Sequence, residues 1–274
     1  MSATRSNRIT QRLIEARQPG RVRLAPYLTA GFPDLEATLA LVRRFDESGC
    51  PVIEIGFPFS DSIADGPTIQ ESFHRVLATG WKVDPLLGAL RDVRSQTKAG
   101  LVAMVSMSIV ARFGVEAFAR RLADCGFDGW IVPDAPLEEQ DIVGQAAAGC
   151  GLCNVLMVAP TTPQARLGGV GSVSTGFVYL IAARGITGER SQLADDLRDN
   201  VGRVRACTET PVLAGFGIHT PAQVRAVCAV ADGAIVGSAV VRRVRQCISR
   251  GDSLEQLVVQ VGGYVDELAV ASKT

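Results

Sequence analysis

Short apolar runs alternate with amphipathic segments along most of the chain, and this alternation limits the possible folds more than any other feature of the sequence. The runs are rich in Val, Ile and Leu and mostly lack a polar residue at every second position, which is typical of strands covered on both faces. Eight runs are predicted to be strands: residues 22–28, 52–55, 101–106, 129–132, 154–158, 177–181, 212–214 and 234–236.

The amphipathic segments between these runs carry residues that commonly begin helices. Asp34 and Thr220 are expected to cap helices, because their side chains accept a hydrogen bond from a free backbone N–H. Asp84 is expected to cap a helix with Pro85 at its first position, where Pro is favoured. The predicted helices are residues 35–47, 85–96, 114–124, 137–148, 194–207 and 221–230.

Eight strands alternating with helices in 274 residues predict an α/β fold, a closed (β/α)8 TIM barrel. A doubly wound open sheet is the alternative. No linker or change in composition divides the chain, so one barrel domain spanning residues 1–274 is expected. Two additions are predicted: a helix before the first strand, around residues 6–17, and an extra helix after the second strand, near residues 69–79.

Charge and composition argue against some classes of partner. The 28 Lys and Arg residues balance 28 Asp and Glu residues, which disfavours nucleic acid or an anionic membrane as the main partner. No apolar run approaches the roughly 20 residues that cross a membrane, and the N-terminal segment lacks the apolar stretch of a signal peptide. The seven cysteines lack zinc-finger spacing and are expected to be reduced thiols. We therefore expect a cytoplasmic protein.

Glu54 lies in the middle of an apolar predicted strand, where an unpaired carboxylate is costly. Its neighbours predict that it points into the barrel near the carboxyl ends of the strands, where active sites of such barrels lie. Partial desolvation there would raise its pKa toward neutrality, which suits a general acid–base group. The alternative is a structural glutamate paired with an arginine of another strand.

The segment that follows this strand is unusually long and contains Asp61 and Asp65. Loops longer than about 12 residues inside compact domains are usually functional or disordered, and the apolar Phe57, Phe59 and Ile63 argue against disorder. Asp65 could offer its carboxylate to a ligand, or it could cap a helix that begins near Pro67. These two roles are compatible.

Glycine-bearing turns follow three successive strands in the last part of the chain, at residues 185–188, 215–219 and 237–238. Glycine lets backbone N–H groups approach an anion closely, and the last two loops of a barrel often bind phosphate. Tight turns without a ligand are the alternative. Tyr179 could hydrogen-bond in the barrel mouth or be a core aromatic residue.

Several other catalytic arrangements find no support in the sequence. His74 and His219 have no companion at a metal-ligand spacing, so no protein-bound metal is expected. No Ser/His/Asp or Cys/His arrangement is present, and lysine is nearly absent from the predicted strands, which disfavours a Schiff-base aldolase.

Seven motifs together resemble one enzyme family. PYLTAGFPD, IEIGFPFSDSIADGPTIQ, GWIVPDAP, LMVAPTT, YLIAARGITG, PVLAGFGI and ADGAIVGSA occur in an order similar to the tryptophan synthase alpha chain, from about Pro26 to Ala239. The resemblance implies a TIM barrel that cleaves indole-3-glycerol phosphate to indole and glyceraldehyde 3-phosphate without a metal, Schiff base or other cofactor. It also implies a beta-chain partner, which carries pyridoxal phosphate, in an alpha2beta2 complex.

The resemblance assigns roles to residues that match the family's motifs. Glu54 matches its acid–base glutamate, which protonates indole C3, and Asp65 matches the aspartate that holds the indole N–H. Glycines and a serine match positions around the phosphate, and Thr187 matches a lid threonine. Tyr27, Phe216 and Ile218 match apolar positions around the indole, and Tyr179 matches a tyrosine near the substrate. The implied substrate-binding positions are Tyr27, Tyr179, Thr187, Gly188, Phe216, Gly217, Ile218, Gly237 and Ser238.

Three departures from the family pattern bear on the partner. Ser62 replaces a usual proline, residues 104–109 lack a Tyr/Asn-Pro motif that faces the beta chain, and His219 replaces a common serine. The altered loop after the third strand raises a second hypothesis, a stand-alone lyase that releases free indole. A different phosphate-binding barrel, such as an isomerase, and a catalytically silent subunit that activates its partner are further alternatives, but both catalytic carboxylates are retained.

Overall fold

The computed structural model describes residues 7–62, 65–182, 190–215 and 217–273. Within them, all strands are parallel and form one sheet in the order β5-β4-β3-β2-β1-β9-β8-β7-β6. The strands are β1 (Leu24–Thr29), β2 (Val52–Gly56), β3 (Gly100–Met104), β4 (Gly129–Ile131), β5 (Cys153–Asn154), β6 (Leu156–Val158), β7 (Val178–Ile181), β8 (Val212–Gly215) and β9 (Gly233–Val236).

The two ends of this strand order are one stretch of chain, so the sheet closes into a barrel. Only Val155 separates β5 from β6. The Val155 N–H still bonds to the Trp130 carbonyl of β4, whereas Leu156 pairs with Val178 of β7. The predicted single strand at residues 154–158 is thus two short pieces, because the chain changes partner within it. The predicted eight-stranded barrel is otherwise confirmed.

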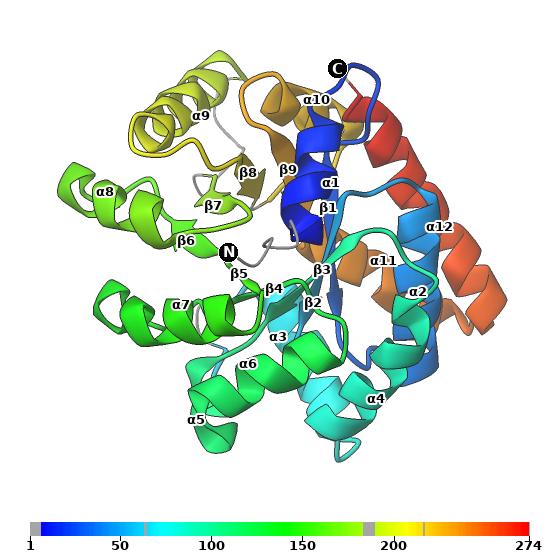
Figure 1. Ribbon diagram of the computed structural model, residues 1–274. Coiled ribbons are helices and arrows are strands. Elements are labelled where there is room, and N and C mark those ends of the chain that lie inside the picture. Colours follow the sequence, from blue (N-terminus) through cyan, green and yellow to red (C-terminus); the bar gives the residue numbers. More distant parts are fainter. Residues whose placement is uncertain (1–6, 63–64, 183–189, 216, 274) are drawn as a thin grey trace.

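Helices surround the barrel (Figure 1). The predicted helix before the first strand is α1, and the predicted extra helix after the second strand is α3. The helices are α1 (Arg8–Ala16), α2 (Leu35–Glu47), α3 (Pro67–Leu77), α4 (Val83–Arg94), α5 (Met107–Phe113), α6 (Val115–Asp124), the 3₁₀ turn η1 (Leu137–Glu139), α7 (Gln140–Gly149), α8 (Gln164–Val173), α9 (Arg190–Arg205), α10 (Pro221–Cys228), α11 (Ser238–Arg250) and α12 (Leu254–Ala271).

The helix caps agree with the sequence at two of three places. Asp34 caps α2 by accepting from the Ala37 N–H, and Thr220 forms a capping box at α10. The prediction that Asp84 caps a helix starting at Pro85 is wrong. The helix α4 begins two residues earlier, at Val83. Pro85 fits its first turn because the N–H groups there have no intrahelical partner, and Asp84 pairs instead with Arg121 of α6.

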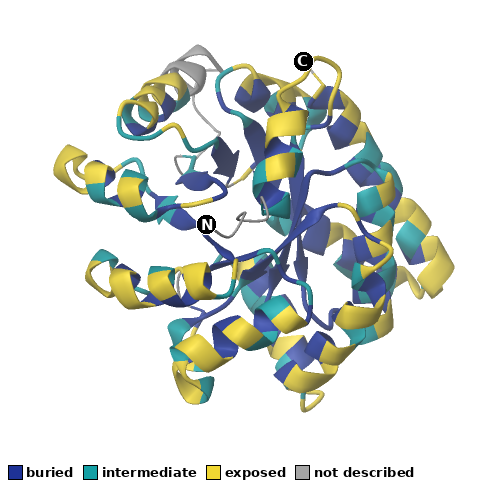
Figure 2. Cartoon of the chain, viewed as in Figure 1, coloured by how far each residue is buried: buried dark blue, intermediate teal, exposed yellow. Residues whose placement is uncertain are grey.

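The strands bury both faces, as Figure 2 shows by the dark blue centre and the exposed outer helix surfaces. Side chains at alternate positions form two separate apolar clusters, one inside the barrel and one between the strands and helices. On β2, for example, Val52 belongs to the inner cluster, whereas Ile53 and Ile55 belong to the outer one. The alternation places Glu54 and Gly56 on the inner side.

The helix α1 closes the amino-terminal end of the barrel (Figure 1). Its Ile9 and Leu13 join the inner cluster, and a Cβ atom on Gly100 of β3 would lie only 2.6 Å from Ile9. Asn7 caps the helix and also donates to the carbonyl oxygens of Asp128 and Gly151. With this end closed, the interior can open only at the carboxyl ends of the strands.

Candidate active site

Glu54 lies on the inner face of β2, opposite Tyr27 of β1 and Val102 of β3 in the strand register. Only 1% of its surface is exposed, and neither carboxyl oxygen has a hydrogen-bond partner among the described residues. Burial raises the pKa of Glu54 to about 8. The described residues include no arginine paired with it, so the structural ion-pair alternative lacks support. At neutral pH Glu54 is mostly protonated and can act as an acid.

Asp65 lies at the end of the loop between β2 and α3. The N-cap of α3 is Gly66 and Pro67 is its first residue, so the alternative that Asp65 caps this helix is not supported. Burial raises the pKa of Asp65 to about 6. No described residue donates a hydrogen bond to its carboxylate, although its carbonyl oxygen accepts from Gln70 Nε2 at 2.9 Å. The carboxylate is therefore available to a ligand.

Two tyrosines bring phenol groups to the same region. Burial raises the pKa of Tyr27 far above its ordinary value, and the charge of Asp65 adds to this effect. Burial likewise raises the pKa of Tyr179, followed by the charges of Glu54 and Asp65. Both tyrosines therefore lie within electrostatic reach of the two carboxyl groups. The family resemblance assigned Tyr27 to an apolar position, whereas the structure shows that its hydroxyl group also lies near the two carboxyl groups.

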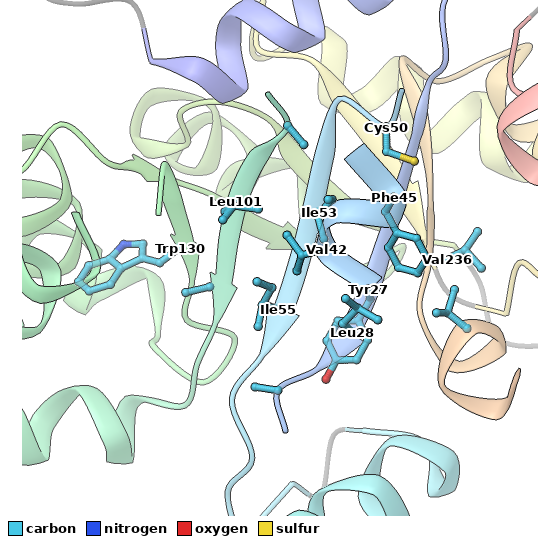
Figure 3. Packing of buried hydrophobic residues seen from close by; sticks show 14 of the residues in the cluster. Tyr27, Leu28, Val42, Phe45, Cys50, Ile53, Ile55, Leu101, Trp130 and Val236 are labelled. Atoms are coloured by element: carbon cyan, nitrogen blue, oxygen red, sulfur yellow. The ribbon is translucent and has the colours of Figure 1, made fainter. Parts of the chain in front are cut away.

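Glycines make room for these phenols, and the sequence interpretation missed the first of them. A Cβ atom on Gly56 would lie 1.9 Å from the Tyr27 hydroxyl oxygen, and one on Gly215 would lie 2.7 Å from that of Tyr179. Figure 3 shows Tyr27 beside β2 with its hydroxyl oxygen toward the Ile55 end. A glycine two residues after a buried glutamate, and so on the same strand face, was the available signal.

The predicted phosphate-binding positions lie at the ends of the neighbouring strands. Gly237 follows β9 and is the N-cap of α11, whose first residue is Ser238. Gly217 adopts a φ of 77°, which favours glycine, and Ile218 is buried. Gly237 is also near the Tyr27 side chain, since its Cβ would lie 3.6 Å from Tyr27 Cβ. The first N–H groups of α11 and its dipole can bind an anion here.

Three of the predicted site residues cannot be placed. Thr187, Gly188 and Phe216 lie outside the described residues. The others lie at the carboxyl ends of β1, β2, β7, β8 and β9 or in the segments that follow them.

The family model of the tryptophan synthase alpha chain matches residues 13–273, which include every candidate site residue. The chain belongs to the tryptophan synthase alpha chain family. Similar curated relatives are the tryptophan synthase alpha chains of Chloroflexus aurantiacus, 40% identical, and Chloroflexus aggregans, 41% identical; each alignment covers 97% of this chain and 98% of the relative.

Solved structures agree with the family and the fold. The tryptophan synthase alpha subunit of Legionella pneumophila superposes with a TM-score of 0.88 at 28% identity, covering 97% of this chain and 98% of that one. A chain of the Mycobacterium tuberculosis tryptophan synthase structure superposes with a TM-score of 0.84 at 35% identity, covering 98% and 99%. The (β/α)8 barrel is thus shared with members of the tryptophan synthase alpha chain family.

The three departures from the usual pattern of the tryptophan synthase alpha chain family have a visible local structure. Ser62 is 5% exposed, so its side chain packs within its own chain. Residues 107–113 form α5, which Ser106 caps, and Asp134 accepts from both the Ser106 hydroxyl and the Met107 N–H. His219 Nδ1 lies 2.8 Å from the Gly217 carbonyl oxygen, beside the glycine turn.

The described residues lack two other features, a metal-binding cluster and a membrane-spanning helix. There, no group of three His, Cys, Asp or Glu residues is placed to hold a metal ion. Among the helices of the same part of the chain, none combines the length and apolarity that a membrane span requires.

Proposed function

We propose that Glu54 and Asp65 carry out the reaction of the tryptophan synthase alpha chain family in this protein. As a member of that family the chain is a lyase of tryptophan biosynthesis, and the reaction is the retro-aldol cleavage of indole-3-glycerol phosphate to indole and glyceraldehyde 3-phosphate. The observation that carries the residue assignment is the burial of Glu54 without a hydrogen-bond partner, next to two tyrosines that also sense the charge of Asp65, a second carboxyl group with a raised pKa.

The proposed chemistry uses the protonated state of Glu54. A group with a pKa of about 8 holds its proton at neutral pH and can transfer it to indole C3. The electron pair for the new C–H bond comes from the ring, which leaves a positive charge on the indole nitrogen. The C3–glycerol bond then breaks toward that nitrogen while the adjacent glycerol hydroxyl becomes an aldehyde. Glu54 recovers its proton from that hydroxyl, so no net proton is consumed.

Asp65 is assigned the complementary task. With a pKa of about 6 it is mostly ionised at neutral pH, and it can accept a hydrogen bond from the indole N–H. Its negative charge would offset the positive charge that develops on the ring in the transition state. Two carboxyl groups with different pKa values in one site are typical of such a division between acid and electrostatic stabiliser.

The substrate phosphate is proposed to bind at the glycine turns. Gly237 and Ser238 would supply backbone N–H groups at the start of α11, and Gly217 would supply one from the turn after β8. Gly188 is proposed for the same role and Thr187 for a lid over the site. The indole is proposed to lie among Tyr27, Tyr179, Phe216 and Ile218. This arrangement needs no arginine or lysine in the phosphate site.

The family implies a beta-chain partner as well as the substrate. We propose an alpha2beta2 complex in the cytoplasm, with pyridoxal phosphate only in the beta chain and no cofactor in this one. The stand-alone lyase is the less favoured hypothesis, because the similar curated relatives are alpha chains of tryptophan synthase.

Indole release from indole-3-glycerol phosphate, with and without a beta chain, tests the proposal. Glu54→Gln should lower kcat by about 10²–10⁴-fold because it removes the transferable proton. The matched control is Glu209→Gln, the same change at an exposed position, which should keep the wild-type rate. Stimulation by the beta chain supports the alpha-subunit role, whereas high unassisted turnover supports the stand-alone lyase. Wild-type activity in Glu54→Gln would overturn the assignment of the acid.

A further inference from the structure

Asp65 is held in place through its backbone rather than through its carboxylate. Its N–H donates to the Ser62 carbonyl oxygen at 3.1 Å. Gln70 Nε2 donates to two carbonyl oxygens of the same loop, Asp65 at 2.9 Å and Ser62 at 3.0 Å. One side chain of α3 therefore fixes both ends of the last turn of the loop.

The helix α3 is in turn fixed to β1 by two buried hydroxyl groups. Ser72 Oγ donates to the Ile69 carbonyl oxygen at 2.7 Å, so its single proton is already used. The 2.7 Å contact between Thr29 Oγ1 and Ser72 Oγ is then a hydrogen bond that Thr29 donates. Thr29 and Ser72 are 2% and 1% exposed. Thr29 also lies beside the Tyr27 phenol and pairs with Gly56 in the strand register.

We propose that Gln70, Ser72 and Thr29, here called the α3 clasp, are positioning residues that hold the Asp65 carboxylate in the active site. The inference rests on the proposed function, because it takes Asp65 as the group that receives the indole N–H. None of the three residues is assigned to contact the substrate. They act through the backbone of the loop and through the helix that follows it.

The physical need for such a clasp follows from the environment of Asp65. Its carboxylate is partly desolvated and receives no hydrogen bond from the described residues, so water would hydrate it better than the protein does. A free loop would let the group turn outward. Because transition-state stabilisation depends on position, a displacement of about 1 Å can cost about 100-fold in rate.

The kinetic test uses Gln70→Met, which keeps the length of the side chain and removes its donor. We expect kcat to fall about 10- to 100-fold with a much smaller change in KM. In an Asp65→Asn background the same change should cost less than about 2-fold, because residues that act through one group are not additive. The control Gln246→Met makes the same substitution at an exposed position of α11 and should leave kcat unchanged. Equal losses in both backgrounds would reject the clasp.

A second test does not depend on turnover. Gln70→Met should increase amide exchange of Asp65 about 10-fold or more as its loop opens, whereas Gln246→Met should not. The carboxyl pKa of Asp65, followed by NMR of labelled aspartate, should fall toward its ordinary value in Gln70→Met as the group becomes hydrated. Thr29→Val should shift the exchange rate and the pKa in the same directions as Gln70→Met. Thr29→Ser keeps the hydroxyl group and should give wild-type values of both. Unchanged exchange and pKa would contradict the proposal.

The two sets of measurements separate the clasp from the proposed function. If wild-type protein releases no indole under any condition, but Gln70→Met still speeds amide exchange of Asp65 and lowers its carboxyl pKa, the lyase assignment fails and the clasp stands. If wild-type protein is active and Glu54→Gln is not, while Gln70→Met matches the wild type in rate and exchange, only the clasp fails.

Discussion

At the scale of single residues, Glu54 is the clearest conflict between stability and function. The apolar side chains around it raise its pKa and leave both oxygens without partners among the described residues. Such a group is costly to ionise, and a hydrophobic residue would fit the strand better. The same burial produces an acid that is protonated at neutral pH, which is the property the proposed reaction needs.

The pH dependence of stability tests this interpretation. The Glu54 pKa is about 8 in the folded chain against an ordinary value of 4.5, so between these pH values the folded chain keeps a proton that the unfolded chain releases. The free energy of unfolding therefore falls as pH rises through this window, by about 1.4 kcal/mol per pH unit at most. Glu54→Gln should remove this loss, so its stability relative to wild type should increase from pH 5 to pH 8. Urea unfolding of both proteins at several pH values measures this difference in stability. A difference that stays constant with pH would contradict the interpretation.

At the scale of elements, α1 is the part whose role the sequence did not predict. The sequence placed a helix at this position but gave it no contact. In the structure its Ile9 enters the end of the barrel and touches the places where Gly100 and Gly129 lack a side chain. Because α1 closes the amino-terminal end of the barrel, this short helix belongs to the inner core although it lies outside the regular alternation of strands and helices.

Replacing Ile9 should therefore destabilise the barrel without touching the active site. Ile9→Ala removes a fully buried side chain and is expected to lower the free energy of unfolding by about 2–5 kcal/mol. Ile14→Ala, on the same helix but 56% exposed, should change it by less than about 0.5 kcal/mol. Urea unfolding measures both, and kcat of the folded Ile9→Ala protein should remain near wild type. Equal effects of the two substitutions would mean that α1 does not close the core.

At the scale of the whole molecule, the barrel closes around one residue, Asn154, which precedes the strand break at Val155. Asn154 of β5 bonds on one side to Trp130 Nε1 of β4 and on the other, through backbone groups, to Thr175 ahead of β7. Its Nδ2 also donates to Gln140 Oε1 of α7. These bonds join two sides of the ring where the strand is broken at Val155.

Removing the Asn154 amide should weaken this closure. Asn154→Ala leaves the Trp130 N–H and Gln140 Oε1 without partners in a buried place, which is expected to cost about 2–4 kcal/mol. Asn200→Ala, on the outer helix α9, is the control and should cost less than about 1 kcal/mol. Urea unfolding measures both. A loss no larger than in the control would show that the closure does not depend on this amide.

The sequence by itself determined the fold class and the family, and it supplied the candidate residues of the site. Apolar periodicity, glycine turns and motif order are local patterns, so they predicted the strands, the barrel, Glu54, Asp65 and the family. Contacts between distant segments are not written in such patterns, because periodicity tells which face of an element is buried but not what covers it. Only the tertiary structure therefore decided that α1 closes the barrel, that Gly56 makes room for Tyr27, and that Gln70 holds Asp65 by its backbone. The sequence also missed the early start of α4, because Asp84 pairs with Arg121 of another helix instead of capping its own.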